Sequence, residues 1–166
     1  DALESADDLN RLGIDGLQDR LAPVYEAIGE VCVTLPEEVA LIGFAGAPWT
    51  IATYMVEGGA SRDYAKTKGW AWRAPDEFGK LIELLGEAIS LHLIKQAEAG
   101  AEVVQIFDSW AGVLPKSLFE RLSLEPILEI ASRFKAACPA VPVIVFPRGA
   151  GSWYPRFAES RFIDAV

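Results

Sequence analysis

The sequence LIGFAGAPWTIATYMVEGG, residues 41–59, carries the clearest structural signals of the chain. It begins inside a continuous apolar run at residues 39–44, and such a run is typical of a parallel strand covered on both faces. Residues 45–47 then predict a tight turn, Pro48 suits the first position of a helix, and the glycines at 58–59 suit its end. The stretch therefore predicts a strand, a turn and a helix in direct succession.

Two further apolar runs, at residues 102–107 and 141–146, predict a second and a third strand. Helices are predicted over residues 23–36, 75–100, from 126 onward and over about 154–165, with a loop or short helices at 1–22 and a polar, aromatic connection at 61–72. Alternating strands and helices favour right-handed βαβ units and an α/β fold with a parallel sheet. Because a complete (β/α)8 (TIM) barrel needs about 250 residues, residues 1–166 are predicted to be a single unit holding about half of one.

Composition excludes several classes of protein. The 166 residues are 51% hydrophobic, which predicts one domain with a sizeable core. With 15 basic and 24 acidic side chains the formal net charge is −9, so the chain repels phosphate backbones and anionic lipids, and no nucleic acid is expected as a partner. The acidic start lacks the features of a signal peptide and no apolar run reaches the roughly 18 residues of a membrane span, so we expect no membrane partner and a cytoplasmic protein.

The sulfur-containing residues are few. Cys32 and Cys138 lie far apart without the spacing of a metal site, and they are predicted to be small buried hydrophobic residues in a reducing compartment. The chain does not begin with methionine, and Met55 is its only one. We therefore expect the sequence to be a piece of a longer protein.

Phenylalanine ends each predicted strand, at Phe44, Phe107 and Phe146, and a glycine-containing turn follows each of them. In parallel α/β folds the carboxyl ends of the strands meet at one edge of the sheet, where reactive groups gather. An apolar floor surrounded by polar groups and backbone amides is therefore expected there. Such a site suits a flat, partly apolar ligand.

Several polar groups at these strand ends allow two interpretations. The turn at Gly46 either aims the amides of a helix amino terminus at an anionic ligand or simply needs a residue without a side chain. Asp108 and Ser109 either face the site, or Asp108 caps the following segment while Ser109 bonds the backbone. The glycines around residues 149–151 lack the full dinucleotide-binding pattern, so a nucleotide ligand is not expected.

Aromatic and imidazole side chains also have a structural alternative. His92 lies on the apolar face of the long predicted helix, where a core imidazole is expected, so a Ser-His-Asp hydrolase is disfavoured. The Tyr54 phenol either donates to a substrate carboxylate or is structural. The tryptophans are expected to pack in the fold and not to form a stacking platform; they are Trp49, Trp70, Trp72, Trp110 and Trp153.

The stretch at 41–59 closely resembles the signature of the uroporphyrinogen decarboxylase family, and VVQIFDSWAG at 103–112 resembles its second inner-strand motif. VPVIVFPRGAG at 141–151 is also similar to bacterial members, so the resemblance covers nearly all of the chain. It implies a cytoplasmic, homodimeric (β/α)8 barrel without metal or organic cofactor. Such an enzyme of haem biosynthesis removes carbon dioxide from four acetate side chains of uroporphyrinogen to leave coproporphyrinogen.

Carried over residue by residue, the resemblance implies that Tyr54 and Ser109 contact the substrate and that Phe44 lines the floor of the cleft. No catalytic residue is expected within this segment, because the family's arginine-rich loop and essential aspartate precede it and a cleft histidine follows it. We therefore expect these residues alone to be inactive. Two alternatives remain open: a non-catalytic half barrel that binds a tetrapyrrole or another chain, and a corrinoid-dependent methyltransferase, whose zinc-binding His-x-Cys pattern is missing here.

Overall fold

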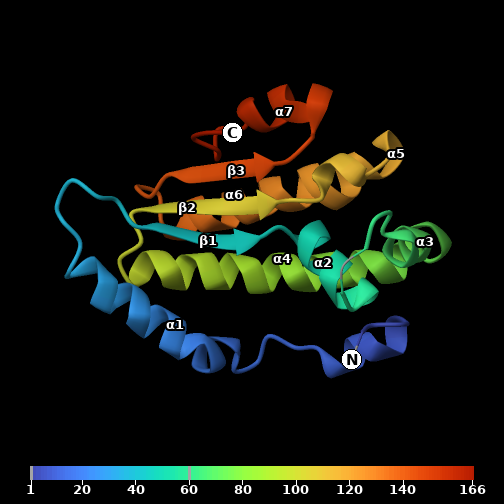
Figure 1. Ribbon diagram of the computed structural model, residues 1–166, viewed down its shortest axis with the longest axis horizontal. Helices are drawn as coiled ribbons and strands as arrows, with labels where there is room; N and C mark the ends of the chain where they lie inside the picture. Colours follow the sequence, from blue (N-terminus) through green and yellow to red (C-terminus); the bar gives the residue numbers. More distant parts are fainter. Residues whose placement is uncertain (1, 60) are drawn as a thin grey trace.

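A computed structural model of the chain describes residues 2–59 and 61–166. Within these residues, β1 (Ile42–Gly46), β2 (Val103–Asp108) and β3 (Val143–Pro147) form one parallel sheet in the order β1-β2-β3. Helices connect each strand to the next, and the three arrows point the same way (Figure 1). This arrangement confirms the predicted α/β fold with parallel strands, consistent with part of a (β/α)8 barrel.

The helices in chain order are α1 (Leu17–Cys32), α2 (Pro48–Glu57), α3 (Ala65–Arg73), α4 (Pro75–Glu98), α5 (Lys116–Phe119), α6 (Glu125–Ala137) and α7 (Tyr154–Ala158). Short turns of other helical types are η1 (Ala6–Arg11), η2 (Ala111–Val113), η3 (Glu120–Leu124) and η4 (Gly151–Trp153). Both α2 and α4 begin with proline, as predicted. The left-handed φ of 71° at Gly58 and 118° at Gly100 explains why glycine follows each of these helices.

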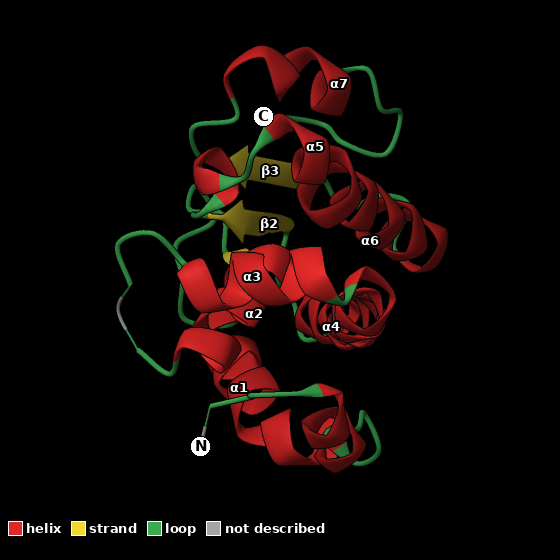
Figure 2. Ribbon diagram, turned by 90° about the vertical axis from the view of Figure 1, so that its right-hand side faces the viewer, coloured by secondary structure: helices red, strands yellow, loops and turns green. Residues whose placement is uncertain are grey.

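One face of the sheet packs against α4 and α6, which lie on the same side of the strands in Figure 2. Alternate strand residues point to this side and are buried; they are Ala45, Val104, Ile106, Val143 and Val145. Phe78 on α4 and Phe134 on α6 have no exposed surface and belong to the same hydrophobic cluster as these strand residues, so the main core lies between the sheet and these helices.

The opposite face of the sheet is apolar but uncovered in the described part of the chain. Its exposed side chains include Ile42 at 47%, Phe44 at 60% and Phe146 at 43%. The prediction that the strands are covered on both faces is therefore not met within residues 2–59 and 61–166. The apolar run did identify the strand correctly, because both faces carry apolar side chains whether or not both are covered.

Two predicted boundaries in the first half of the chain are wrong. Helix α1 begins at Leu17, and Pro23 lies inside it, where a missing backbone donor costs one helical hydrogen bond. The predicted connection at 61–72 contains helix α3, whose inward positions are Thr67, Trp70 and Ala71. Their three- and four-residue spacing is helical, but a polar threonine and a small alanine weaken the apolar signal.

The end of the chain also differs from the prediction. Helix α7 stops at Ala158, whereas the sequence predicted a helix to about residue 165. Asp164 and Ala165 instead donate backbone hydrogen bonds to the Val143 carbonyl, and Val145 donates to the Ala165 carbonyl. These bonds, made along the free edge of β3, satisfy backbone groups that a longer helix would have paired within itself.

Candidate functional site

The loops that follow the three strands meet at one edge of the sheet. The Ala47 amide donates to the Phe107 carbonyl at 2.8 Å, which ties the first loop to the end of β2. The Arg148 amide donates to the Asp108 carbonyl at 3.1 Å, and the Gly112 amide donates to the Arg148 carbonyl at 2.9 Å. The second and third loops are therefore joined in both directions, and the predicted convergence of the strand ends is confirmed.

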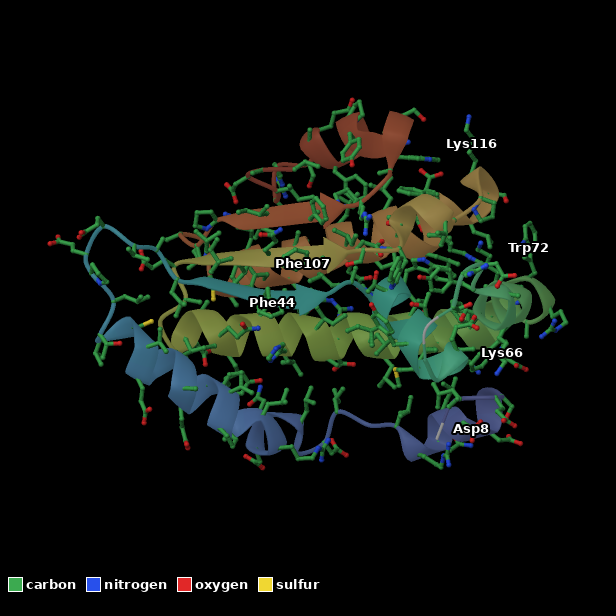
Figure 3. All side chains as sticks on the ribbon, viewed as in Figure 1. Asp8, Phe44, Lys66, Trp72, Phe107 and Lys116 are labelled. Carbon is green, nitrogen blue, oxygen red and sulfur yellow. The ribbon has the colours of Figure 1, made fainter. Side chains whose placement is uncertain are left out.

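Three phenylalanines form a row across this edge on the open face of the sheet. The ring centroids of Phe44 and Phe107 lie 5.8 Å apart, and those of Phe107 and Phe146 lie 5.9 Å apart, both edge to face. Figure 3 labels Phe44 and Phe107 on the neighbouring strands β1 and β2. The row is an apolar floor of the kind the sequence predicted, with Phe107 at its centre between the other two rings.

Tyr54 and Ser109 lie on the elements that follow β1 and β2 in the chain. Tyr54 is on α2 with 52% of its surface exposed, and its ring meets Trp110 edge to face at 6.4 Å. Ser109 is the residue before Trp110 and is partly buried. The structure thus brings together the elements that carry Tyr54, Ser109 and Phe44, because Phe107 precedes Ser109 by two residues and contacts Phe44.

Asp108 points away from this floor into the protein and is fully buried. Its Oδ1 accepts a hydrogen bond from the Thr50 hydroxyl at 2.6 Å, and its Oδ2 accepts one from the Ser123 hydroxyl at 2.6 Å. The hypothesis that Asp108 caps the following segment is therefore wrong, since its carboxylate binds side chains and no backbone amide of a helix start. Burial raises the pKa of Asp108 to about 6, although the hydrogen bonds from Ser123 and Thr50 act in the opposite direction.

The turn at Gly46 has a steric reason. A side-chain carbon added there would lie 3.0 Å from Ile51 Cγ1, which is closer than an ordinary contact. The amide of Ala47 is occupied by the Phe107 carbonyl and is not available to an anion. The structure therefore gives a steric reason for the glycine at this turn.

His92 has the structural role that its position predicted. Its Nδ1 lies 3.1 Å from the Tyr25 hydroxyl, which joins α4 to α1. Burial lowers the pKa of the imidazole, which favours its neutral form. The contact belongs to a helix interface and not to the strand ends.

The tryptophans mostly pack, as expected. The indole of Trp49 is buried and donates to the Trp110 carbonyl at 3.0 Å, Trp70 meets Phe78 at 5.5 Å, and Trp153 stacks on Phe119 at 4.9 Å. Trp72 differs, because 58% of its surface is exposed.

The cysteines are only half buried, which corrects the expectation of fully buried side chains. The Cys32 thiol donates to the Gly100 carbonyl at 3.1 Å. The part of the chain that the structure describes has no group of three His, Cys, Asp or Glu side chains placed to hold a metal ion. None of the helices in these residues combines the length and the apolar character that crossing a membrane requires.

Phe107 and Phe146 belong to this row, but the predicted substrate contacts did not include them. The signal was present in the sequence, because each strand ends in phenylalanine. Only the register, which pairs Gly46 with Phe107 and Phe107 with Phe146, shows that the ring of Phe107 bridges the other two.

Comparison with known proteins gives one consistent family. The family model described as uroporphyrinogen decarboxylase (URO-D) matches residues 1–166. Curated relatives named uroporphyrinogen decarboxylase include one from Rhodospirillum rubrum, 47% identical over 166 residues, which are 100% of this chain and 48% of the relative. Another, from Brucella anthropi, is 42% identical over 161 residues, 97% of this chain and 47% of the relative. A third, from Maricaulis maris, is 43% identical over 155 residues, 93% of this chain and 45% of the relative. The chain spans about half the length of the curated relatives it matches.

Proposed function

The chain belongs to the uroporphyrinogen decarboxylase family, and from this we propose that the whole protein removes carbon dioxide from the four acetate side chains of uroporphyrinogen III to give coproporphyrinogen III. The proposal makes the protein a carboxy-lyase of haem biosynthesis. As the resemblance implies, it works as a cytoplasmic homodimer without metal or organic cofactor. Nucleic acid is not among its partners, in keeping with the formal net charge of −9.

The row of Phe44, Phe107 and Phe146 is the observation that supports this proposal best. Its rings lie 5.8 and 5.9 Å apart along one edge of the sheet, which gives a broad apolar surface. A tetrapyrrole has a large apolar ring system with carboxylates at its periphery, so its rings suit this floor and its carboxylates need donors beside it. The proposal assigns this donor role to the hydroxyls of Tyr54 and Ser109, whose helix and loop meet at Trp110.

The chemistry requires a positive charge to develop on the substrate. Protonation of a pyrrole ring creates an iminium-like centre, and this centre accepts the electron pair of the carbon–carboxylate bond as carbon dioxide leaves. The exocyclic methylene that remains takes up a proton at its carbon, and the ring loses the proton it had gained, which leaves a methyl group. A fixed carboxylate near the ring nitrogens stabilises the cation, and arginines hold the carboxylates of the substrate. In this proposal Tyr54 and Ser109 bind the substrate and Phe44 lines the floor. The family's arginine-rich loop, which holds the substrate carboxylates, and its aspartate and histidine lie outside residues 1–166.

Residues 1–166 alone are accordingly proposed to be inactive. A formal net charge of −9 opposes the binding of a substrate with eight carboxylates unless a cluster of cations offsets it. Measurable turnover by the isolated chain would contradict this part of the proposal.

Steady-state kinetics of the complete natural protein test the proposed function and the role of Tyr54 together. Uroporphyrinogen III is kept reduced under anaerobic conditions, and the oxidised products are separated by chromatography. We expect turnover by the wild type and a rise in KM of about ten- to a hundredfold for Tyr54→Phe, because a hydrogen bond to a charged group is worth about 1.5–3 kcal/mol.

Tyr25→Phe is the matched control for this experiment. It also removes one phenol hydroxyl, but that hydroxyl bonds His92 at the interface of α1 and α4. Its KM should equal that of the wild type. Absence of turnover by the wild type refutes the proposed function. If Tyr54→Phe and Tyr25→Phe have the same KM, only the assigned role of Tyr54 is refuted.

A non-catalytic protein is a second candidate, because the open sheet face exposes Ile42 at 47% and Phe44 at 60%. Such a face suits a half barrel that binds a tetrapyrrole or a second copy of itself. Sedimentation and the turnover assay on the same natural protein distinguish the two. An associated protein without turnover supports the second candidate, and turnover refutes it.

A further inference from the structure

Asp108 occupies an unusual place for a carboxylate. It is the last residue of β2, directly before Ser109, yet it has no exposed surface and points to the side of the sheet that the helices cover. Both carboxylate oxygens are bonded to hydroxyls, one from Thr50 on α2 and one from Ser123 on η3. A charge-bearing group is costly to bury, so the position of Asp108 between α2 and η3 requires an explanation.

The bond to Thr50 fixes the turn that carries Ser109. The Thr50 hydroxyl gives its hydrogen to Asp108, and its oxygen accepts the backbone N–H of Trp110 at 3.3 Å. The indole of Trp49 donates to the Trp110 carbonyl at 3.0 Å. Helix α2 therefore holds the backbone of Trp110 at both the N–H and the carbonyl of that residue. Asp108 sets the direction of the Thr50 hydroxyl, whose oxygen accepts the Trp110 N–H.

Tyr54 shares this arrangement because it lies four residues after Thr50 on the same helix. Residues four apart lie on one face of a helix, and both do meet Trp110, one at the backbone and one at the ring. A rotation or shift of α2 relative to β2 would thus move Tyr54 and Ser109 with respect to each other.

The bond to Ser123 fixes the carboxylate from the other side. Ser123 lies in a π-helical turn, Glu120–Leu124, and is 1% exposed. Such turns are rare and occur frequently at functional sites. The side chains of Leu122 and Leu124 on either side of it are buried, so this turn is held in place by the core.

We propose that Asp108 is a positioning residue, whose carboxyl group, held between the Thr50 and Ser123 hydroxyls, fixes Tyr54 on α2 and Ser109 after β2 in the relative orientation that binds the substrate. The inference rests on the proposed function and extends it to three buried residues that do not touch the substrate. It differs from a purely structural role, which would reduce the amount of folded protein but leave substrate affinity unchanged.

Substitutions of the two hydroxyl partners test this inference in the complete natural protein. Thr50→Val keeps the shape of the side chain and removes the hydroxyl, Thr50→Ser keeps the hydroxyl, and Ser123→Ala removes the second donor. Ser90→Ala is the matched control, because Ser90 is a buried serine on α4 whose hydroxyl donates to the Gly86 carbonyl of its own helix at 2.7 Å. The measurements are kcat and KM for uroporphyrinogen III, with circular dichroism to quantify the folded protein.

The inference predicts that Thr50→Val raises KM about tenfold, because a displaced Tyr54 loses its hydrogen bond to a charged carboxylate of the substrate. Ser123→Ala should raise KM several-fold, and Thr50→Ser and Ser90→Ala should stay within about twofold of the wild type. Because both donors act through Asp108, the variant that combines Thr50→Val with Ser123→Ala should raise KM by less than the product of the two single increases.

Other outcomes overturn the inference. Folded Thr50→Val and Ser123→Ala proteins with the KM of the wild type show that the carboxylate does not position the site. If Thr50→Val does not fold, Ser123→Ala decides alone; if neither folds, the bonds serve folding and the positioning role is refuted. A wild type without turnover refutes the proposed function itself, which is visible before any variant is compared.

Discussion

Replacing Asp108 with asparagine should remove a specific part of the pH dependence of stability. Burial raises the pKa of this carboxyl from 3.8 to about 6 in the folded protein. The folded state therefore binds the proton more tightly than the unfolded state, and the carboxyl destabilises the fold increasingly as the pH rises from about 4 to about 7. Asparagine is uncharged over this whole pH range, so Asp108→Asn lacks this pH-dependent destabilisation.

The magnitude follows from the two pKa values. With about 1.4 kcal/mol for each pH unit between them, the ionised carboxylate costs about 3 kcal/mol at pH near 7.5. At pH near 4.5 the same linkage leaves a cost of about 1 kcal/mol. The free energy of unfolding of the wild type, minus that of Asp108→Asn, should thus increase by about 2 kcal/mol when the pH is lowered across this range.

Urea unfolding of both proteins at the two pH values, followed by circular dichroism, measures this difference. Asp164→Asn is an opposite control, because hydrogen bonds from Lys135 and the Val143 amide lower the pKa of Asp164. The wild type should lose stability relative to Asp164→Asn as the pH falls. If the free energies of unfolding of the wild type and Asp108→Asn change equally with pH, or differ with the opposite sign, burial does not raise the pKa of Asp108 and the reasoning is refuted.

Three further outcomes are expected. Phe134→Ala should lower the free energy of unfolding by about 3–5 kcal/mol, because a fully buried ring is lost from between α6 and the sheet; an unchanged urea midpoint would contradict this. Gly112→Ala should cost more free energy in kcat/KM than in unfolding, since the added carbon would lie 3.0 Å from the Arg148 carbonyl and force two loops of the site apart. Kinetics and urea unfolding of the same preparation measure the two free-energy changes. Extensive dialysis of the complete protein against a chelator should leave its turnover unchanged, and restoration of lost activity by zinc would refute a cofactor-free reaction.

The strands were predictable because a parallel strand needs a run of apolar residues and little else. The predicted run at residues 39–44 begins before the observed β1 (Ile42–Gly46), and the other two strands differ by at most two residues at either end. Proline at the start and glycine at the end located α2 and α4 well, since both residues act through their own backbone geometry. Helix α3 was missed because its inward face is short and partly polar.

The polar interior of the site could not be predicted from local sequence. Asp108 is 58 residues from Thr50 and 15 from Ser123, and only the folded chain brings the three together. The same holds for Phe107, whose position between two other rings depends on strand register. The family resemblance supplied Tyr54, Ser109 and Phe44 as substrate contacts, and their role remains a prediction although the elements that carry them are now seen to be neighbours.

The most direct test of the account is the amount of carbon dioxide released by the complete natural protein for each uroporphyrinogen III consumed. The proposed function predicts four molecules of carbon dioxide for each substrate molecule at completion, with coproporphyrinogen III as the product. Substrate that remains unchanged, or consumption without release of carbon dioxide, would contradict it.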